Sequence, residues 1–310
     1  MKKVIVTGGA GFIGSHLTEL LLSRGYHVII IDDLSTGKKA NIEPLLKSIK
    51  VEFIQDSITN LPLLQNLFQG VDFVFHQAAL SSVPRSVEDP LSTNEVNITG
   101  TLNVLLAARD NNVKKVIYAS SSSVYGDTPT LPKREDMIPH PQSPYALTKL
   151  VGEYYCRIFH QIYNLPTICL RYFNVYGPRQ DSDSQYAAVI PISITRLSQD
   201  KPPIIYGDGE QTRDFTFVKD VIQANIIGAE SDANGIFNIG RGENSTINDL
   251  AKTIINLVGK DLQSEYRPPR VGDVKHSLAD ISRARAIGYE PQYSLEDGLR
   301  ETIRGTKNAK

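Results

Sequence analysis

Short apolar runs alternate with helical patterns along the first half of the chain. A β-branched run at residues 4–6 leads into closely spaced glycines, after which Ile13, Leu17 and Leu21 recur at the spacing of one helix face. A second apolar run follows at residues 28–31. Short strands that are apolar throughout are typical of a parallel sheet with helices on both faces.

The alternation continues to about residue 177 and predicts the remaining elements of the sheet. Further strands are expected at residues 51–54, 71–76, 116–119 and 167–171, and helices at 61–68, 91–110 and 143–163. Together these elements predict an α/β fold with a doubly wound parallel sheet, a Rossmann fold, which binds its ligands at the carboxyl ends of the strands.

The pattern changes near Pro178, after which proline, glycine and isolated polar residues become more frequent. We therefore predict a Rossmann domain over residues 1–177 and a smaller mixed C-terminal lobe over residues 178–310. No flexible linker separates the two parts, so we expect the chain to cross back from the lobe to the first domain.

The glycines after the first strand match two versions of a dinucleotide-binding motif. Gly8, Gly11 and Gly14 give GxxGxxG, and Gly9 with Gly11 and Gly14 gives GxGxxG. Glycine permits the tight turn and the approach of the backbone to a pyrophosphate, and the following helix N-terminus favours the phosphate charge. Asp32 ends the second strand, where a carboxylate accepts both adenosine ribose hydroxyls and repels a 2′-phosphate. We therefore predict NAD rather than NADP as the cofactor.

Composition narrows the classes of function. The 310 residues carry a formal net charge of −1, which gives no electrostatic case for nucleic acid or a membrane surface as a partner. No apolar run is as long as a membrane span, and a core strand follows Lys3 directly, so we expect neither an anchor nor a signal peptide. Cys156 and Cys169 are the only cysteines and lack metal-ligand spacing. We expect buried free thiols in a cytoplasmic protein, and no metal site.

Tyr145 and Lys149 lie four residues apart in the helix predicted at 143–163, and so on one face of it. A free tyrosine, whose pKa is about 10, is a poor base at neutral pH. A lysine cation about 4 Å away contributes up to about 4 kcal/mol at an effective dielectric constant of 20, enough to lower the phenol pKa toward neutrality. The serines at 120–123 end the fifth predicted strand, where a hydroxyl faces the ligand and shares its proton with Tyr145.

These motifs occur together in one known family. In chain order they are TGGAGFIG, SSSSVYG, SPYALTK, LRYFNVYGPRQ, GDGEQTRDF and RPPRVGDVKHSLADIS. Over nearly its whole length the chain resembles the extended short-chain dehydrogenase/reductase family, and within that family the nucleotide-sugar 4-epimerases. Among these it is most similar to the UDP-N-acetylhexosamine 4-epimerases.

The resemblance implies an isomerase and a set of catalytic residues. Ser121, Tyr145 and Lys149 match that set, and Ser122 is a neighbouring hydroxyl and a further candidate. In the implied reaction, Tyr145 takes the proton of the sugar 4-hydroxyl while a hydride leaves C4 for bound NAD. The transient 4-keto sugar then presents its other face, and the returning hydride inverts C4.

The resemblance also implies the ligand contacts. For the cofactor they are Gly8, Gly11, Phe12, Ile13, Gly14, Asp32, Ser57, Ile58, Gln77, Ala78, Ala79, Asn97, Tyr145, Lys149 and Tyr172. For the UDP-sugar they are Ser81, Ser82, Ser121, Asn174, Gln180, Ala188, Val189, Tyr206, Arg213, Arg270, Asp273 and Ser277. A physical argument also supports Arg213 and Arg270, because a guanidinium offers a diphosphate two parallel hydrogen-bond donors.

The identity of the sugar depends on a gate position of the family. The position that is bulky in hexose-only members aligns with Ser277, and a small residue there leaves room for a 2-acetamido group. Ser81, Ser82 and Gln180 also resemble the acetamido-preferring branch. We therefore expect UDP-GlcNAc and UDP-GalNAc as substrates. Activity on UDP-glucose and UDP-galactose stays open, because pocket size discriminates poorly against a smaller sugar.

Other functions were weighed against this one. A UDP-glucose 4-epimerase without acetamido activity and a UDP-glucuronate 4-epimerase or decarboxylase share most of the motifs. A dTDP-glucose 4,6-dehydratase needs an acid pair where this chain has Ser122 and Ser123. An NAD-binding regulatory scaffold would not need Ser121, Tyr145 and Lys149 together.

A homodimer is expected by resemblance alone. Family members usually pair through two long helices of each subunit, here the helices predicted at 91–110 and 143–163. The apolar residues expected at that interface are Leu105, Leu150, Tyr154 and Phe159.

Overall fold

The computed structural model describes residues 2–181, 188–269 and 275–308. Its centre is a sheet of seven parallel strands in the order β11-β6-β5-β4-β1-β2-β3. The strands are β1 (Lys3–Thr7), β2 (His27–Ile31), β3 (Val51–Ile54), β4 (Phe73–His76), β5 (Lys115–Ser121), β6 (Thr167–Tyr172) and β11 (Gly235–Ile239). The doubly wound parallel sheet is thereby confirmed, and its order is that of a Rossmann fold with β11 added beside β6.

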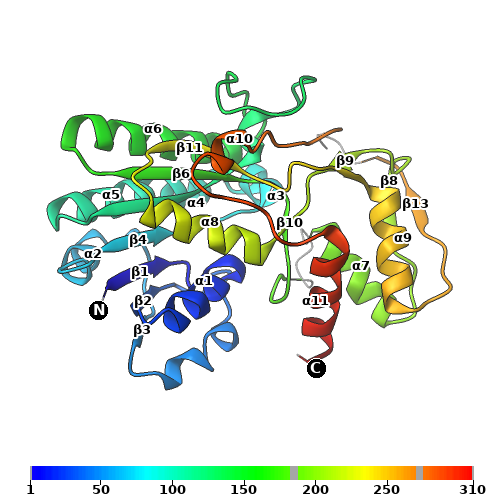
Figure 1. Cartoon of the computed structure of the whole chain (residues 1–310), viewed down its shortest axis with the longest axis horizontal. Coiled ribbons are helices and arrows are strands. Elements are labelled where there is room, and N and C mark those ends of the chain that lie inside the picture. The colour runs from blue at the N-terminus through cyan, green and yellow to red at the C-terminus, as the bar shows by residue number, and fades with distance from the viewer. Residues whose placement is uncertain (1, 182–187, 270–274, 309–310) are drawn as a thin grey trace.

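Helices cover both faces of this sheet (Figure 1). One face carries α1 (Phe12–Ser23) and α8 (Val218–Glu230), and the other carries α2 (Leu61–Leu67), α5 (Gly100–Asp110) and α6 (Pro144–Tyr163). Val4 and Val6 of β1 pack in the hydrophobic layer on the α1 and α8 side, and Ile5 packs in the layer on the α2, α5 and α6 side. All three are fully buried. Because both sides of the strand are buried, its sequence is apolar throughout.

β11 was not predicted from the sequence. It pairs with β6 in register from Gly235 opposite Ile168 to Ile239 opposite Tyr172. Asn238 interrupts its apolar run, yet this side chain is fully buried and accepts a hydrogen bond from the Tyr125 hydroxyl at 2.7 Å. A buried strand with a satisfied polar residue does not have the apolar pattern on which the prediction relied.

The helix predicted at 91–110 is present in three parts. They are α4 (Pro90–Asn94), a π-helical turn over Glu95–Thr99, and α5. A short helix, α3 (Val83–Glu88), precedes them. The π turn contains Asn97, which is 1% exposed, and such turns occur most often beside functional sites.

Local signals explain the limits of α6. Ser143 is its N-cap, with the hydroxyl accepting the N–H of Ala146 at 3.1 Å, and Pro144 occupies the first helical position. Asn164 ends the helix in the left-handed conformation with φ of +54°. The prediction over 143–163 is therefore confirmed to within one residue.

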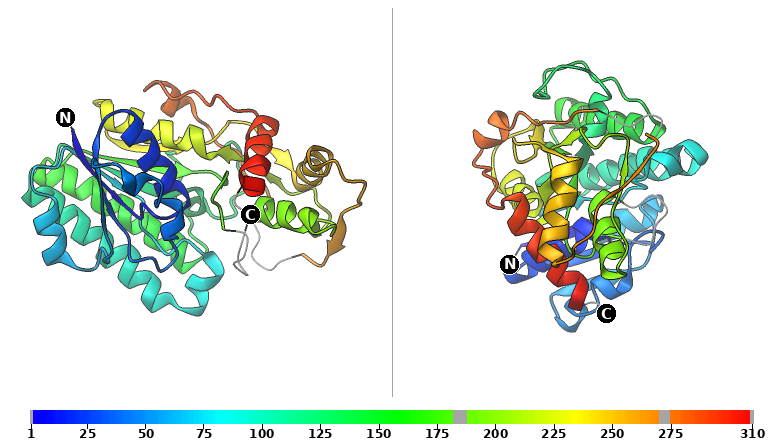
Figure 2. Two further views of the ribbon diagram at one scale, coloured as in Figure 1. Left: turned by 90° about the horizontal axis from the view of Figure 1, so that it is seen from below. Right: turned by 90° about the vertical axis from the view of Figure 1, so that its right-hand side faces the viewer.

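Most of the remaining elements form a lobe at one end of the sheet (Figures 1 and 2). Its helices are α7 (Val189–Ser198), α9 (Ile247–Val258) and α11 (Leu295–Asn308), whereas α10 (Ser282–Arg285) packs against β11 of the central sheet. Three pairs of short strands accompany them: β7 (Val175–Tyr176) with β10 (Thr216–Phe217), β9 (Thr212–Arg213) with β12 (Ser245–Thr246), and β8 (Ile204–Tyr206) with β13 (Glu265–Arg267). The hydrophobic core on the α1 side of the sheet continues into this lobe.

Three of the four residues expected at a dimer interface belong instead to the core of the chain. Leu105, Leu150 and Phe159 are 0%, 8% and 4% exposed, whereas Tyr154 is 43% exposed. A helical pattern does not tell a core-facing stripe from a partner-facing one, and this is why the prediction was wrong for those three. The large apolar side chains that α6 exposes are Leu147, Tyr154, Ile158, Ile162 and Tyr163.

Cys156 and Cys169 are buried free thiols, as predicted. Among the described residues, no helix combines the length and the hydrophobicity needed to cross a membrane.

Candidate active site

A pocket lies at the carboxyl ends of the central strands, where the chain order reverses between β1 and β4. Every residue assigned to the cofactor from the sequence lines this pocket except Asn97. The lining also includes Ser81 from the predicted sugar-binding set. The pocket is therefore a candidate site for a dinucleotide with a substrate beside it.

The glycines at the head of α1 leave no space for side chains. A Cβ atom on Gly14 would lie 2.1 Å from the carbonyl oxygen of Gly8, and one on Gly8 would lie 2.7 Å from the backbone of Ala78. Gly8 also has φ of +67°, a conformation that favours glycine. The first N–H groups of α1, from Phe12 onward, have no carbonyl partner within the helix and face the pocket. This turn fits a pyrophosphate group.

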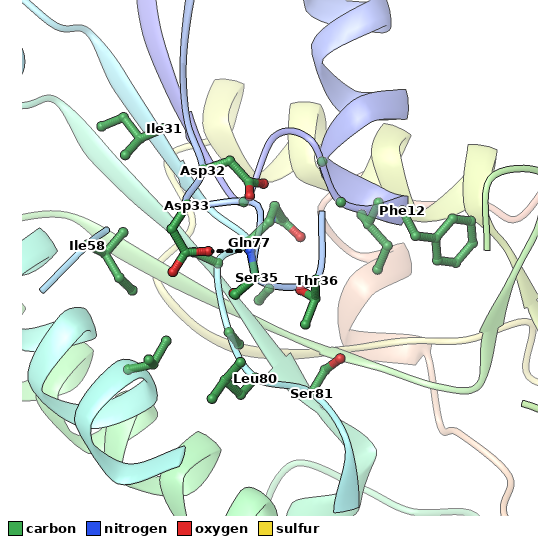
Figure 3. A pocket seen from close by; sticks show the side chains of 18 of the residues that line it. Phe12, Ile31, Asp32, Asp33, Ser35, Thr36, Ile58, Gln77, Leu80 and Ser81 are labelled. Atoms are coloured by element: carbon green, nitrogen blue, oxygen red, sulfur yellow. Dashed lines mark hydrogen bonds between the residues drawn. The ribbon is translucent and has the colours of Figure 1, made fainter. Parts of the chain in front are cut away.

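Asp32 is held at the end of β2 by the loops around it. One carboxylate oxygen accepts the N–H of Ala10 and the other accepts the N–H of Leu34, both at 2.9 Å. Burial raises the pKa of Asp32, and these N–H donors lower it. Figure 3 shows the neighbouring Asp33 over the same pocket, with its carboxylate accepting the N–H of Ser35 at 2.9 Å. The end of β2 therefore presents two carboxylates to a ribose.

Sequence reasoning missed several residues that line the pocket. They are Ile31, Asp33, Ser35, Thr36, Asp56, Leu80, Val96 and Ala119, whereas Ser120, which also lines the pocket, belongs to the serine run that the sequence indicated. Most of them follow the carboxyl end of a strand, which is the signal that could have identified them. Asp56 stands next to the assigned Ser57 and accepts that residue's N–H at 2.7 Å, so it adds a carboxylate at the end of β3.

Asn97 acts behind the pocket wall. Its amide oxygen accepts the N–H of Leu80 at 2.8 Å, and its amide nitrogen donates to the Leu80 carbonyl at 3.1 Å and to the Thr148 hydroxyl at 3.0 Å. Leu80 lines the pocket, and Thr148 adjoins Lys149 on α6. Asn97 therefore fixes the wall of the pocket rather than forming part of it.

His76 fixes the backbone at the end of β4 through a chain of hydrogen bonds. The Thr101 hydroxyl donates to the Asn97 carbonyl at 2.6 Å, so toward His76 it accepts from Nε2–H at 2.9 Å. His76 Nδ1 then accepts the Thr7 hydroxyl at 2.7 Å, and that hydroxyl accepts the N–H of Ala78 at 3.2 Å. The chain of donors requires a neutral imidazole, and burial lowers the pKa of His76 to about 3.

The predicted catalytic side chains meet at the ends of β5 and α6. Tyr145 and Lys149 are 9% and 4% exposed, and the Ser121 side chain forms a hydrogen bond with the Tyr145 phenol. Lys149 donates from Nζ to the carbonyl of Ala119 at 2.7 Å. Ser122 lies in the 3₁₀ turn that follows β5. Tyr145, Lys149 and Ala119 line the pocket together.

The effect of Lys149 on Tyr145 differs from the sequence-based expectation. Lys149 Nζ lies 6.0 Å from the centroid of the Tyr145 ring. Burial raises the pKa of Tyr145, and the hydrogen bond to Ser121 is what lowers it. Burial also lowers the pKa of Lys149 to about 8, while the carboxylate of Glu153 raises it. Ser121 is therefore the group that most directly assists ionisation of the phenol in this arrangement.

A buried amide joins two further pocket residues. The Gln77 side chain donates to Asn225 Oδ1 at 2.9 Å, and Asn225 donates from Nδ2 to the Tyr172 hydroxyl at 2.8 Å. Asn225 belongs to α8 and is fully buried. The second half of the chain thus holds two residues at the ends of β4 and β6.

The residues assigned to the UDP-sugar lie mainly in the lobe. Asn174 donates to the Asp214 carbonyl at 3.0 Å, and the N–H of Ser277 donates to the Thr212 carbonyl at 3.0 Å. Arg213 donates to the carbonyls of Thr212 and Lys275 at 2.9 and 3.2 Å.

The other members of this set occupy the ends of elements or loops. Gln180 donates to the Val175 carbonyl at 3.1 Å, and its buried Oε1 has no hydrogen-bond partner among the described residues. Ala188 and Val189 begin α7, Tyr206 ends β8, and Ser82 is the N-cap of α3. Arg270 and Asp273 lie outside the described residues.

Known proteins resemble this chain over almost its whole length. A model of the NAD dependent epimerase/dehydratase family matches residues 4–240. A putative UDP-glucose 4-epimerase of Methanocaldococcus jannaschii is 40% identical over 307 residues, which cover 98% of each chain.

Two solved structures share the fold closely. The UDP-N-acetylglucosamine 4-epimerase of Methanobrevibacter ruminantium, in complex with UDP-N-acetylmuramic acid, superposes with a TM-score of 0.97 at 45% identity, covering 100% of this chain and 99% of that one. The UDP-glucose 4-epimerase of Thermotoga maritima, with UDP-glucose, superposes with a TM-score of 0.94 at 39% identity, covering 99% of both chains.

Proposed function

This chain belongs to the NAD dependent epimerase/dehydratase family, and on that premise we propose that it interconverts UDP-GlcNAc and UDP-GalNAc by inverting C4. It is an NAD-dependent isomerase, and UDP-sugars are its class of substrate. The observation that carries the proposal is that Tyr145, hydrogen-bonded to Ser121, and Lys149 line one end of the pocket whose other walls are the glycine turn and Asp32.

The pocket fits NAD by the chemistry of its walls. The glycine turn and the head of α1 would hold the pyrophosphate, and Asp32 would hold the adenosine ribose. The carboxylates of Asp32 and Asp33 oppose a 2′-phosphate, in agreement with NAD rather than NADP. When bound, NAD accepts a hydride from the sugar carbon and later returns it.

Tyr145 moves the proton in this reaction. As a phenolate hydrogen-bonded to Ser121, it accepts the proton of the sugar 4-hydroxyl as C4 is oxidised, and as a phenol it returns that proton after the keto sugar presents its other face. Lys149 is held over the site by the Ala119 carbonyl and contributes a cation as the phenolate forms. Burial of Tyr145 and Lys149 keeps bulk water from competing for the proton.

The proposal of an acetamido sugar rests on two residues of the UDP-sugar set, Ser277 and Gln180. Ser277 is a small side chain, 8% exposed, on a segment whose backbone is fixed to Thr212. The buried Oε1 of Gln180, which has no hydrogen-bond partner among the described residues, is an acceptor suited to an amide N–H. The similarity to a UDP-N-acetylglucosamine 4-epimerase supports the same choice.

UDP-glucose is the second candidate substrate. Two of the relatives are UDP-glucose 4-epimerases by name, and a pocket with room for an acetamido group does not exclude a hydroxyl in the same place. UDP-glucuronate is the third substrate to be assayed, because the enzymes that act on it share most of the motifs.

The proposal is tested by incubating the purified protein with each of the three UDP-sugars without added reductant and resolving the products by chromatography. We expect UDP-GalNAc from UDP-GlcNAc with no net NADH. Turnover of UDP-glucose alone would keep the epimerase and overturn the acetamido preference. A product from UDP-glucuronate alone would make UDP-glucuronate the substrate in place of UDP-GlcNAc. No turnover of any of the three would contradict the assigned catalytic residues.

We further propose that the enzyme is a cytoplasmic homodimer. Leu147, Tyr154, Ile158 and Ile162 recur at helical spacing along α6 and are 39–65% exposed, which is unusual for a helix face without a partner. A second copy of α6 is the partner that this face fits, because in a two-fold dimer the apolar face of each α6 would cover that of the other. The two free buried thiols fit a reducing compartment.

A further inference from the structure

A buried carboxylate lies where several segments of the lobe meet. Asp214, which directly follows Arg213, is 0% exposed. Its Oδ1 accepts the N–H of Arg241 at 2.7 Å, and its Oδ2 accepts the N–H groups of Gly242 and Ala279 at 3.0 and 3.1 Å. The donors come from the turn after β11 and from the stretch before α10, which are far apart in the sequence. One side chain therefore joins three parts of the chain.

The turn after β11 is shaped to this carboxylate. A Cβ atom on Gly240 would lie 2.8 Å from Asp214 Oδ2 and 2.7 Å from the side chain of Ala279. Gly242 has φ of +74°, which favours glycine. Both glycines are needed for the backbone to approach the carboxylate this closely.

Two of the three joined segments carry residues of the candidate UDP-sugar set. Arg213 precedes Asp214, and the Asp214 carbonyl accepts the side chain of Asn174 at 3.0 Å. Ser277 is two residues before Ala279, on the stretch that the carboxylate holds. The spacing of Arg213 and Ser277 therefore depends on the Asp214 carboxylate, whereas Asn174 is held by the backbone carbonyl of the same residue.

We propose, resting on the function given above, that Asp214 is the positioning residue of the UDP-sugar site, whose carboxylate fixes Arg213 and Ser277 relative to one another without touching the ligand. A carboxylate suits this role because its two oxygens accept several N–H groups at once, whereas an amide offers one acceptor oxygen. Loss of the carboxylate leaves buried N–H groups unpaired and frees the segments to separate.

The burial of Asp214 has a free-energy cost that packing alone does not explain. Burial raises the pKa of Asp214 to about 6, although the three N–H donors lower it. A carboxylate maintained against such a cost is typical of functional sites.

The experiment compares Asp214→Asn with Asp220→Asn. Asp220 is 2% exposed and also accepts two backbone N–H groups, from Gln292 at 2.9 Å and Tyr293 at 3.3 Å, but none of these residues belongs to the UDP-sugar set. For each purified protein we would measure the Kd of UDP by calorimetry, the bound NAD, the melting temperature, and KM and kcat. UDP is the probe because it is common to all the candidate sugars.

We expect Asp214→Asn to raise the Kd of UDP and the KM at least tenfold, with NAD retained and kcat within threefold of the wild type. Asp220→Asn should change the Kd less than twofold at a similar loss of melting temperature. Wild-type affinity for UDP in Asp214→Asn, or an equal weakening in Asp220→Asn, would overturn the inference. If Asp214→Asn does not fold, Gly240→Ala takes its place, and an unchanged Kd there would overturn it too. Failure of the proposed function is distinct, because it appears as a wild-type protein without UDP affinity or epimerase activity.

Discussion

The guanidinium of Arg171 and the carboxylate of Glu153 meet through two hydrogen bonds of 2.8 and 2.7 Å, with both side chains almost completely buried. Glu153 belongs to α6, one turn after Lys149, and Arg171 to β6. The Ser120 hydroxyl donates to the same carboxylate at 2.5 Å, and Arg171 stacks on the Tyr125 ring at 4.6 Å. The pair therefore joins the catalytic helix to the two strands beside it.

Removing one member of this pair is expected to be strongly destabilising. Glu153→Gln leaves a buried guanidinium without its counter-ion, so we expect the free energy of unfolding to fall by about 3–5 kcal/mol. Denaturant titration measures it. The control is Glu290→Gln, which breaks the exposed pair with Arg285 and should cost less than about 1 kcal/mol. Equal losses in both variants would contradict the assigned role of burial.

Tyr145→Phe should keep the fold and the bound NAD but lower kcat by about 10²–10⁴-fold, because the proton acceptor is removed. Steady-state turnover of UDP-GlcNAc measures the loss. Tyr154→Phe, an exposed tyrosine on the same helix, is the matched control and should retain full activity. Near-normal epimerisation by Tyr145→Phe would exclude this residue as the base.

Ser277→Tyr should lower kcat/KM for UDP-GlcNAc more than tenfold further than for UDP-glucose, because the ring occupies the space proposed for the acetamido group. Parallel assays on the two sugars give the ratio. Ser277→Ala, which keeps the space, should leave the ratio unchanged. A ratio that stays constant in Ser277→Tyr would remove Ser277 from the specificity of the enzyme.

The stability should fall below about pH 6.5 in part through His76. Its pKa in the folded protein is about 3, below the usual 6.5, so between these values only the unfolded chain binds the proton. The contribution is therefore complete above about pH 6.5 and falls by about 1.4 kcal/mol per pH unit as the pH decreases toward 3.

His76→Gln removes this titration, so the difference in unfolding free energy between pH 7 and pH 5 should be about 2 kcal/mol smaller in the variant. Denaturant titrations of both proteins at the two pH values measure it, and the other titrating groups cancel in the comparison. The same pH dependence in the variant would show that His76 is not the group responsible.

Ile158→Glu should convert the proposed dimer into a monomer, because it places a charge in the apolar face of α6. Light scattering after gel filtration gives the mass. Ile49→Glu is the control, since Ile49 is 95% exposed away from α6 and should not alter the mass. A monomeric wild-type protein, or a dimer in Ile158→Glu, would contradict the proposed interface.

Much of the Rossmann half follows from local patterns. The strands and the ends of α6 can be recognised from residues that are close together in the sequence. The spacing of the glycines likewise predicts the turn before α1. β11 was not predicted because its apolar run is interrupted by Asn238. This buried side chain is tolerated because it accepts a hydrogen bond from Tyr125, a residue distant in the sequence. The pKa of Tyr145 and the proposed role of Asp214 could not be predicted for the same reason. Burial and the remote Ser121 side chain determine the first, and backbone N–H donors from remote segments determine the second. Tertiary contacts of this kind leave no periodic signal.

The placement of β11 beside β6 also has a consequence for synthesis on the ribosome. The strand that shields the free edge of β6 emerges more than sixty residues after it, as the pairing of Ile168 with Gly235 requires. During that interval the nascent sheet presents an unpaired row of N–H and C=O groups, which is a template for wrong pairing. The late strand also raises the contact order of the fold, so closure of this edge is expected among the slower steps of folding.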